Sequence, residues 1–150
     1  MEDRYLFKAK RIDNGEWEIG SLIALPTGEY EISNKCNNPP DCDPMWDKVV
    51  ITHKVDPSTI CQCTGLKDNN GKLIWENDVI KYHFRYLYAQ IRYGAYQSCF
   101  DSQKAQHIGF YVDWAESRNY RKDLGFWINM INAEIVGNIF DNPELLESEG

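Results

Sequence analysis

The chain has 150 residues, of which 43% are hydrophobic and 13% are aromatic, so it can build a core and is not a disordered chain. No apolar run approaches the roughly 20 residues that a membrane-spanning helix needs. The charged first residues are unlike a secretory signal, so we expect a cytoplasmic protein with no membrane partner. The formal net charge of −7 disfavours non-specific nucleic-acid binding but is compatible with a local basic face.

The first third of the chain alternates between apolar and polar residues. This period predicts short β-strands over residues 5–10, 17–25, 30–32 and 49–55. Asn14 and Gly15 supply the positive φ angles of a tight hairpin turn. Residues 33–47 contain three prolines and predict an irregular insertion loop. Asp56 and Pro57 favour a turn or a single helical turn, because Asp caps such a turn and Pro suits its first position.

The remaining residues continue the strand pattern. A turn is expected over 68–71, and one long strand is expected from Ile80 to Tyr88, with a bulge or turn after it. Further strands are predicted over residues 108–114, 126–131 and 133–139, with a frayed end at 147–150. About eight short strands and little helix predict a mainly β fold, either a small barrel or a sandwich.

Three segments of the chain carry a resemblance to a known family. They are residues 5–11 with 14–23, residues 55–80, and residues 134–146. The distinctive positions within the last two are Thr64, Gly65, Leu66, Asp68, Gly71, Glu76, Asn77, Asp78, Gly137 and Asn138. In order and spacing these segments resemble the YopX family of phage- and prophage-encoded proteins. Together they extend over nearly the whole chain.

The resemblance implies a single domain over residues 1–150 with an SH3-like β-barrel, and a phage or prophage protein acting in the bacterial host cytoplasm. It implies no reaction, cofactor or catalytic residue. Two positions depart from the family pattern. Asn77 stands where the family has Gly, and Asn is the next-best residue for a left-handed backbone position. Cys63 stands where the family usually has an aromatic residue.

The five cysteines form no recognisable disulfide or zinc pattern. An odd count without a secretion signal argues against a disulfide framework. A structural zinc site typically uses two pairs, each separated by about two to four residues. Here five residues separate Cys36 from Cys42, and one separates Cys61 from Cys63. Cys61 and Cys63 are expected on one strand face as small buried residues. We therefore predict no metal and no cofactor.

Three carboxylates, Asp68, Glu76 and Asp78, cluster around the two turns of the middle segment. They could bind a cation or act in acid–base chemistry, but turn chemistry explains these residue types unaided. The three histidines flank no nucleophile, and the chain has no metalloprotease, hydrolase or phosphate-loop motif. We therefore do not expect an enzyme. An enzyme or a metal-binding protein remains the third alternative.

The stretch from Val79 to Phe100 has no acidic residue and combines cations with many aromatic rings. Its cationic side chains, including one histidine, are Lys81, His83, Arg85 and Arg92. Cations beside stackable rings suit single-stranded nucleic acid, although strand alternation separates the two sets onto opposite faces. The favoured prediction is instead a module that binds a host or phage protein through aromatic-lined surfaces. Homo-oligomerisation is compatible with either alternative.

Overall fold

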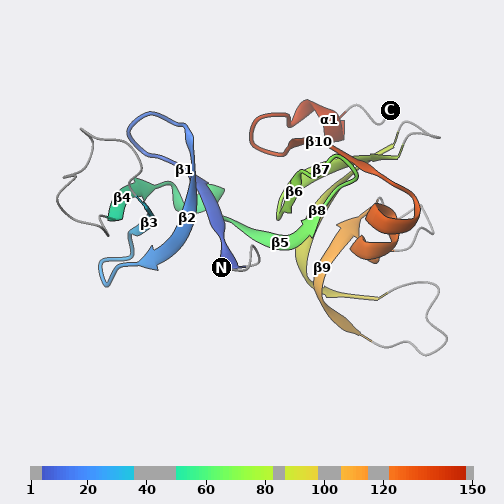
Figure 1. The fold of residues 1–150 in the computed structure, drawn as a ribbon, viewed down its shortest axis with the longest axis horizontal. Helices are drawn as coiled ribbons and strands as arrows, with labels where there is room; N and C mark the ends of the chain where they lie inside the picture. The colour runs from blue at the N-terminus through green and yellow to red at the C-terminus, as the bar shows by residue number, and fades with distance from the viewer. Residues whose placement is uncertain (1–4, 36–49, 83–86, 98–105, 115–121, 148–150) are drawn as a thin grey trace. The chain divides into compact units, whose positions relative to one another are not determined.

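The computed structural model describes residues 5–35, 50–82, 87–97, 106–114 and 122–147. The chain divides into two compact units, residues 1–63 and 64–150, and strand β5 (Cys61–Lys67) runs from the first into the second. The described strands form two antiparallel sheets, with the orders β4-β3-β2-β1-β5-β6 and β10-β7-β8-β9 (Figure 1). The prediction of a mainly β chain is therefore confirmed. No helix in the described ranges is long and apolar enough to cross a membrane.

The first unit is built on a meander of four strands, β1 (Phe7–Lys10), β2 (Trp17–Ala24), β3 (Tyr30–Lys35) and β4 (Val50–Val55). Because successive side chains of a strand point to opposite faces, one face collects the apolar residues. Its core is Ala9, Ile32 and Val55, with Leu22, Tyr30 and Ile60 packed around them. The alternation read from the sequence is the cause of this arrangement.

The turns of the first unit follow their residue chemistry. Asp56 Oδ1 accepts a hydrogen bond from Ser58 N at 3.0 Å, and Pro57 begins the 3-10 helix η2 (Pro57–Thr59). This confirms the predicted capped turn. In the turn between β1 and β2, Gly15 has φ +72°. Asn14 has no positive φ, so the turn is not the two-residue type expected for Asn-Gly.

The end of β4 returns to the end of β1 without closing a barrel. Arg11 and Val55 form an isolated bridge, flanked by hydrogen bonds from Ile12 N to Lys54 O and from Asp56 N to Lys10 O. On its other side β1 pairs with β5 over only two residue pairs. The described strands therefore make two sheets and no closed barrel, and the SH3-like barrel expected from the resemblance is not confirmed.

The ion pair between Lys54 and Glu29 predicts a pH response that can be measured. Lys54 Nζ lies 2.9 Å from Glu29 Oε2, and this hydrogen bond holds the pKa of Glu29 below its usual value. A carboxyl whose pKa is lowered in the folded state stabilises the protein at pH values above its unfolded-state pKa. This stabilisation is lost as the pH falls through the folded-state pKa. We expect Lys54→Met to raise the pKa of Glu29 toward its usual value in an NMR titration.

Asp13 provides an internal control for that titration. Hydrogen bonding from Arg11 lowers the pKa of Asp13, and Lys54 takes no part in that pair. The pKa of Asp13 should therefore be the same in the wild-type protein and in Lys54→Met. If the pKa of Glu29 did not move, or if both carboxyls moved together, the ion pair would not be the cause of the lowered pKa.

The second unit combines a four-stranded sheet with strand β6 (Leu73–Trp75) of the other sheet and one turn of π-helix. The four strands are β7 (Asp78–Tyr82), β8 (Leu87–Tyr96), β9 (His107–Asp113) and β10 (Glu134–Asn138), and the short helix α1 (Glu144–Glu147) follows. Its core holds the buried residues Ile74, Ile80, Leu87, Ala89, Ile91, Val112, Trp114, Leu124, Trp127, Ile128 and Ala133. This is the larger of the two cores in the described chain.

Two strand predictions in the second unit are wrong. The long strand expected from Ile80 to Tyr88 is two antiparallel strands, because Tyr82 pairs with Leu87 across a reversal of the chain. The strand expected over 126–131 is instead the π-helix η3 (Phe126–Met130). Its buried residues are the neighbours Trp127 and Ile128, which a helix turn can bury together and a strand cannot bury on one face.

Most of the tryptophans and cysteines in the described part of the chain are core residues. Trp75, Trp114 and Trp127 are buried, whereas Trp17 is half-buried under the ammonium groups of Lys8 and Lys10. Cys61 and Cys63 are buried on β5, as the sequence predicted. The predicted insertion loop over 33–47 is wrong at its start, because residues 33–35 belong to β3. The rest of that loop, with Trp46, Cys36 and Cys42, lies outside the described residues, as does Cys99.

Candidate partner interface

The basic surface predicted from the sequence does not assemble among the described residues. Lys81 lies on β7 directly opposite Glu134 of β10. Arg92 lies on β8, where its Nε is 3.2 Å from Asp113 Oδ2 of β9. His83 and Arg85 lie outside the described residues. The two described cations therefore stand on different strands and each faces a carboxylate, which leaves little local positive charge for a phosphate backbone.

The first part of the middle segment has a structural role. Thr64 Oγ1 donates to Ile74 O at 2.8 Å and accepts from Leu66 N, while Gly65 takes a φ of +82°. Asp68 Oδ1 accepts from Asn70 N and Lys72 N, each at 2.9 Å, and Gly71 has φ +79°. The prediction that Asp68 holds the turn is confirmed.

The second turn of the segment is equally structural. Asp78 Oδ2 accepts a hydrogen bond from Trp75 N at 2.8 Å across Glu76 and Asn77. Asn77 has φ +72°, which confirms the left-handed position inferred from the Asn-for-Gly exchange. Its amide donates to Ile91 O, and its carbonyl accepts from Ile139 N. The segment therefore joins the start of β7 to β8 and to the residue that follows β10.

We expect position 77 to prefer residues that tolerate a left-handed backbone. Asn77→Gly should change the unfolding free energy by less than about 0.5 kcal/mol. Gly removes the strain of the left-handed backbone, and this offsets the loss of the hydrogen bond from Gln90 Nε2 to Asn77 Oδ1. Asn77→Ala loses that bond and keeps the strain, so it should cost about 1–2 kcal/mol. Urea unfolding of the three proteins measures both values. An Ala variant as stable as the Gly variant would contradict the left-handed assignment.

The closing motif is a turn after β10. Asn138 Oδ1 accepts from Phe140 N and Asp141 N at 3.0 and 2.9 Å, and Asn142 N donates to Asn138 O. A Cβ on Gly137 would overlap the side chain of Asn142. No group of three or more His, Cys, Asp or Glu side chains in the described ranges could hold a metal ion. The family-motif residues thus build turns and strand junctions.

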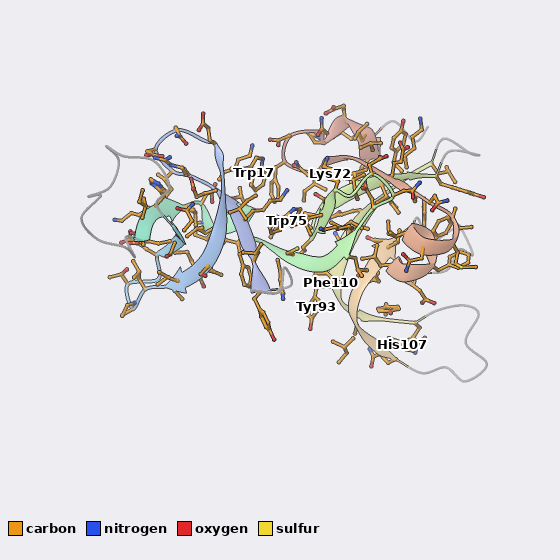
Figure 2. All side chains as sticks on the ribbon, viewed as in Figure 1. Trp17, Lys72, Trp75, Tyr93, His107 and Phe110 are labelled. Carbon is orange, nitrogen blue, oxygen red and sulfur yellow. The ribbon has the colours of Figure 1, made fainter. Side chains whose placement is uncertain are left out.

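A different surface is formed by the halves of β8 and β9 that extend beyond the core. We call residues 92–96 and 107–111 the ribbon tip. Ile91 pairs with Val112, and both are fully buried in the core. Beyond that pair the two strands continue together, with Tyr93 opposite Phe110 and Ala95 opposite Ile108. Figure 2 shows Tyr93 and Phe110 side by side on the ribbon, with His107 farther along it.

One face of the ribbon tip is apolar and exposed. Paired residues of antiparallel strands share a face, so Tyr93, Ala95, Ile108 and Phe110 follow Ile91 and Val112 on the same side. Ile108 is 76% exposed and Tyr93 is 53% exposed. The rings of Tyr93 and Phe110 pack edge-to-face with centroids 5.0 Å apart. This apolar face therefore continues the core side of the sheet out into solvent.

The opposite face of the ribbon tip carries an aromatic stack. The ring of Tyr96 stacks on His107 at 5.3 Å and on Tyr111 at 5.1 Å. Gly94 and Gly109 pair between these rings, and a Cβ on Gly94 would lie 4.0 Å from Tyr111 Cε1. The glycine pair leaves room for the tyrosine rings to lie over the strands. The stack stiffens the ribbon and so holds the apolar face in place.

The ribbon tip was not predicted from the sequence. The pattern placed Arg92 in a stretch of cations and aromatic rings, and it predicted only a further strand over residues 108–114. The signal was present in the two glycines and in the length of β8, which has ten residues. A strand longer than the core it covers must leave apolar side chains exposed. That length becomes visible only once the partners of β8 are known.

The geometry defines a mainly β protein of two antiparallel sheets, with structural family motifs and an exposed apolar ribbon. The model of one protein family, described as YopX protein, matches residues 7–147. The chain therefore belongs to the YopX family, as the three sequence segments predicted. No curated protein matches it.

Proposed function

We propose that this protein is a non-enzymatic binding module whose protein partner docks on the apolar face of the ribbon tip. The observation that carries the proposal is that Ile108 and Tyr93 are exposed on the ribbon tip. They share one face of the ribbon with Phe110, whose ring packs against Tyr93. Exposed aromatic and aliphatic anchors supply most of the binding free energy at protein interfaces. We retain the expectation of a phage or prophage accessory protein in the host cytoplasm, with an SH3-like fold, as part of this proposal.

Local charge supports a protein partner over a nucleic acid. The strands β8 and β9 carry one arginine and one aspartate, and these two residues form an ion pair with each other. The ribbon is thus close to neutral on a chain whose formal net charge is −7. A neutral apolar patch is desolvated at low cost, whereas phosphate binding needs several uncompensated cations. Single-stranded nucleic acid is therefore the weaker candidate.

The test is capture of partners from host lysate by the immobilised protein and by Ile108→Thr. Thr keeps the β-branched shape of a strand residue and removes apolar contact. The wild-type protein should recover a partner that docks on the ribbon tip, and the variant should recover about tenfold less of it or lower still. A tenfold loss corresponds to roughly 1.4 kcal/mol of binding free energy.

The matched control is Ile12→Thr, because Ile12 is 64% exposed and lies outside the ribbon. This variant should recover the same partner as the wild-type protein. Equal loss in both variants, or a partner retained by Ile108→Thr, would show that the ribbon tip is not the docking surface.

A further inference from the structure

The edge of β8 that faces away from β9 carries backbone groups that no described strand uses along the ribbon tip. On this edge β7 pairs with β8 only as far along as Gln90, and Asn77 N then donates to Ile91 O. Backbone groups two residues apart on a strand point the same way, so those of Tyr93 and Ala95 point to the same edge as the carbonyl of Ile91. In the described ranges no strand pairs with β8 at these two residues on that side.

This edge lacks the features that protect most exposed strand edges. Such edges are typically blocked by Lys, by Pro or by a β-bulge. Residues 93–97 contain no charged residue and no proline, and both Tyr93 and Ala95 are exposed. β8 pairs with β9 in one unbroken register from Gln90 to Tyr96, so no bulge bends the edge away. The edge is therefore ready to pair with another strand.

We propose that β8 pairs antiparallel with β8 of a second copy of this chain, with Ala95 on the two-fold axis. Ala95 N–H then donates to Ala95 C=O of the second copy, and the two-fold symmetry repeats this bond. In the same register Tyr93 lies opposite Gln97 of the second copy. The inference goes beyond the proposed function, because this pairing uses the backbone edge of the ribbon tip and leaves its apolar face open to another protein.

The side chains of the ribbon tip suit a second copy of the chain. Tyr93 lies diagonal to Ala95 of the second copy, within reach of an aromatic side chain, so the pairing covers part of this exposed ring. Ile108 lies beside Ala95 in each copy, so the two apolar faces become one continuous surface across four strands. Two copies of an acidic chain repel one another, and the near-neutral ribbon is where that repulsion is smallest.

Charged side chains at the two-fold axis test the pairing. Position 95 faces itself, so Ala95→Glu and Ala95→Lys each place two like charges directly opposite one another. Light scattering of the unmodified chain should give twice the chain mass of 17.5 kDa. Each charged variant should self-associate about tenfold more weakly or less. An equimolar mixture of the two variants should restore the dimer, and native mass spectrometry should find one copy of each variant in it.

The matched control is Ala95→Gln, which has the size of the Glu variant without its charge and should remain dimeric. Circular dichroism should show the same β signal for all three variants, because Ala95 is exposed and β8 keeps its pairing with β9. A monomeric wild-type chain overturns the pairing. A mixture of the charged variants that stays monomeric, or an Ala95→Glu variant as dimeric as Ala95→Gln, overturns the register. Capture of another protein through Ile108 is measured separately, so the proposed function can stand without this dimer.

Discussion

Gly20→Ala should destabilise the protein by roughly 3 kcal/mol, because no space exists for a methyl group at this point of β2. A Cβ built on Gly20 overlaps the carbonyl oxygen of Ser33 and lies 3.0 Å from its carbonyl carbon. That carbonyl belongs to the backbone of β3, which is paired on both sides by β2 and β4. The methyl group can be accommodated only if the two strands separate, so the register of the first unit is at risk.

Urea unfolding at fixed pH measures the effect, and Gly125→Ala is the matched control. Gly125 has helical angles of φ −57° and ψ −38°, and the nearest atom to its Cβ position lies 3.8 Å away. Ala is a better helix residue than Gly, so this variant should gain up to about 1 kcal/mol. A Gly20→Ala protein as stable as Gly125→Ala would contradict the close approach of β2 and β3.

Trp127→Ala should cost about 3–5 kcal/mol, because it removes the centre of the aromatic cluster in the second unit. Trp127 is buried, and its ring centroid lies 4.8 Å from Trp114, 5.2 Å from Tyr82 and 5.5 Å from Phe126. The small side chain leaves a cavity that these rings can fill only in part. Loss of the near-ultraviolet circular dichroism signal should accompany the lower unfolding free energy.

Met130→Ala is the control for this change on the same π-helix. Met130 is 72% exposed, so its truncation should alter the unfolding free energy by no more than about 0.5 kcal/mol. If Trp127→Ala were as mild as Met130→Ala, the packing of η3 against the sheet would be wrong. The strand originally expected over 126–131 would then regain support.

Local chemistry made the turns of this protein predictable. Asp56 caps η2, Asp68 holds the turn before Gly71, and Asn77 takes the left-handed backbone, as their residue types indicate. Each depends on atoms within about four residues of the chain, which is the range that a single sequence reports well. The same holds for the buried pair Cys61 and Cys63 on one strand face.

Features that depend on contacts between distant parts of the chain were not predictable. The reversal between Tyr82 and Leu87 carries no Gly, Pro, Asn or Asp in the sequence, so apolar alternation ran through it and indicated one strand. The π-helix η3 has no sequence signal of its own, because burial of Trp127 and Ile128 against the sheet decides it. Tertiary packing overrode local propensity at both places.

The candidate site was missed for the same reason. Cations among aromatic residues suggested a nucleic-acid surface, but the cross-strand ion pair of Arg92 with Asp113 and the register of Lys81 with Glu134 depend on distant parts of the chain. The exposure of Ile108 depends on where the core ends beneath the ribbon. Alternation predicts which face a residue occupies and does not predict whether that face is covered.

Site-specific photo-crosslinking at Tyr93 tests the central claim most directly. Benzoylphenylalanine in place of Tyr93 keeps an aromatic side chain on the apolar face of the ribbon tip, and the same substitution at Ile12 serves as the reference. After irradiation of bacterial cells that produce the protein, we expect discrete protein adducts at position 93 that are absent at position 12. Mass spectrometry then separates a second copy of the chain from another protein. Equal adducts at the two positions, or none at position 93, would contradict the assignment of the ribbon tip as the docking surface.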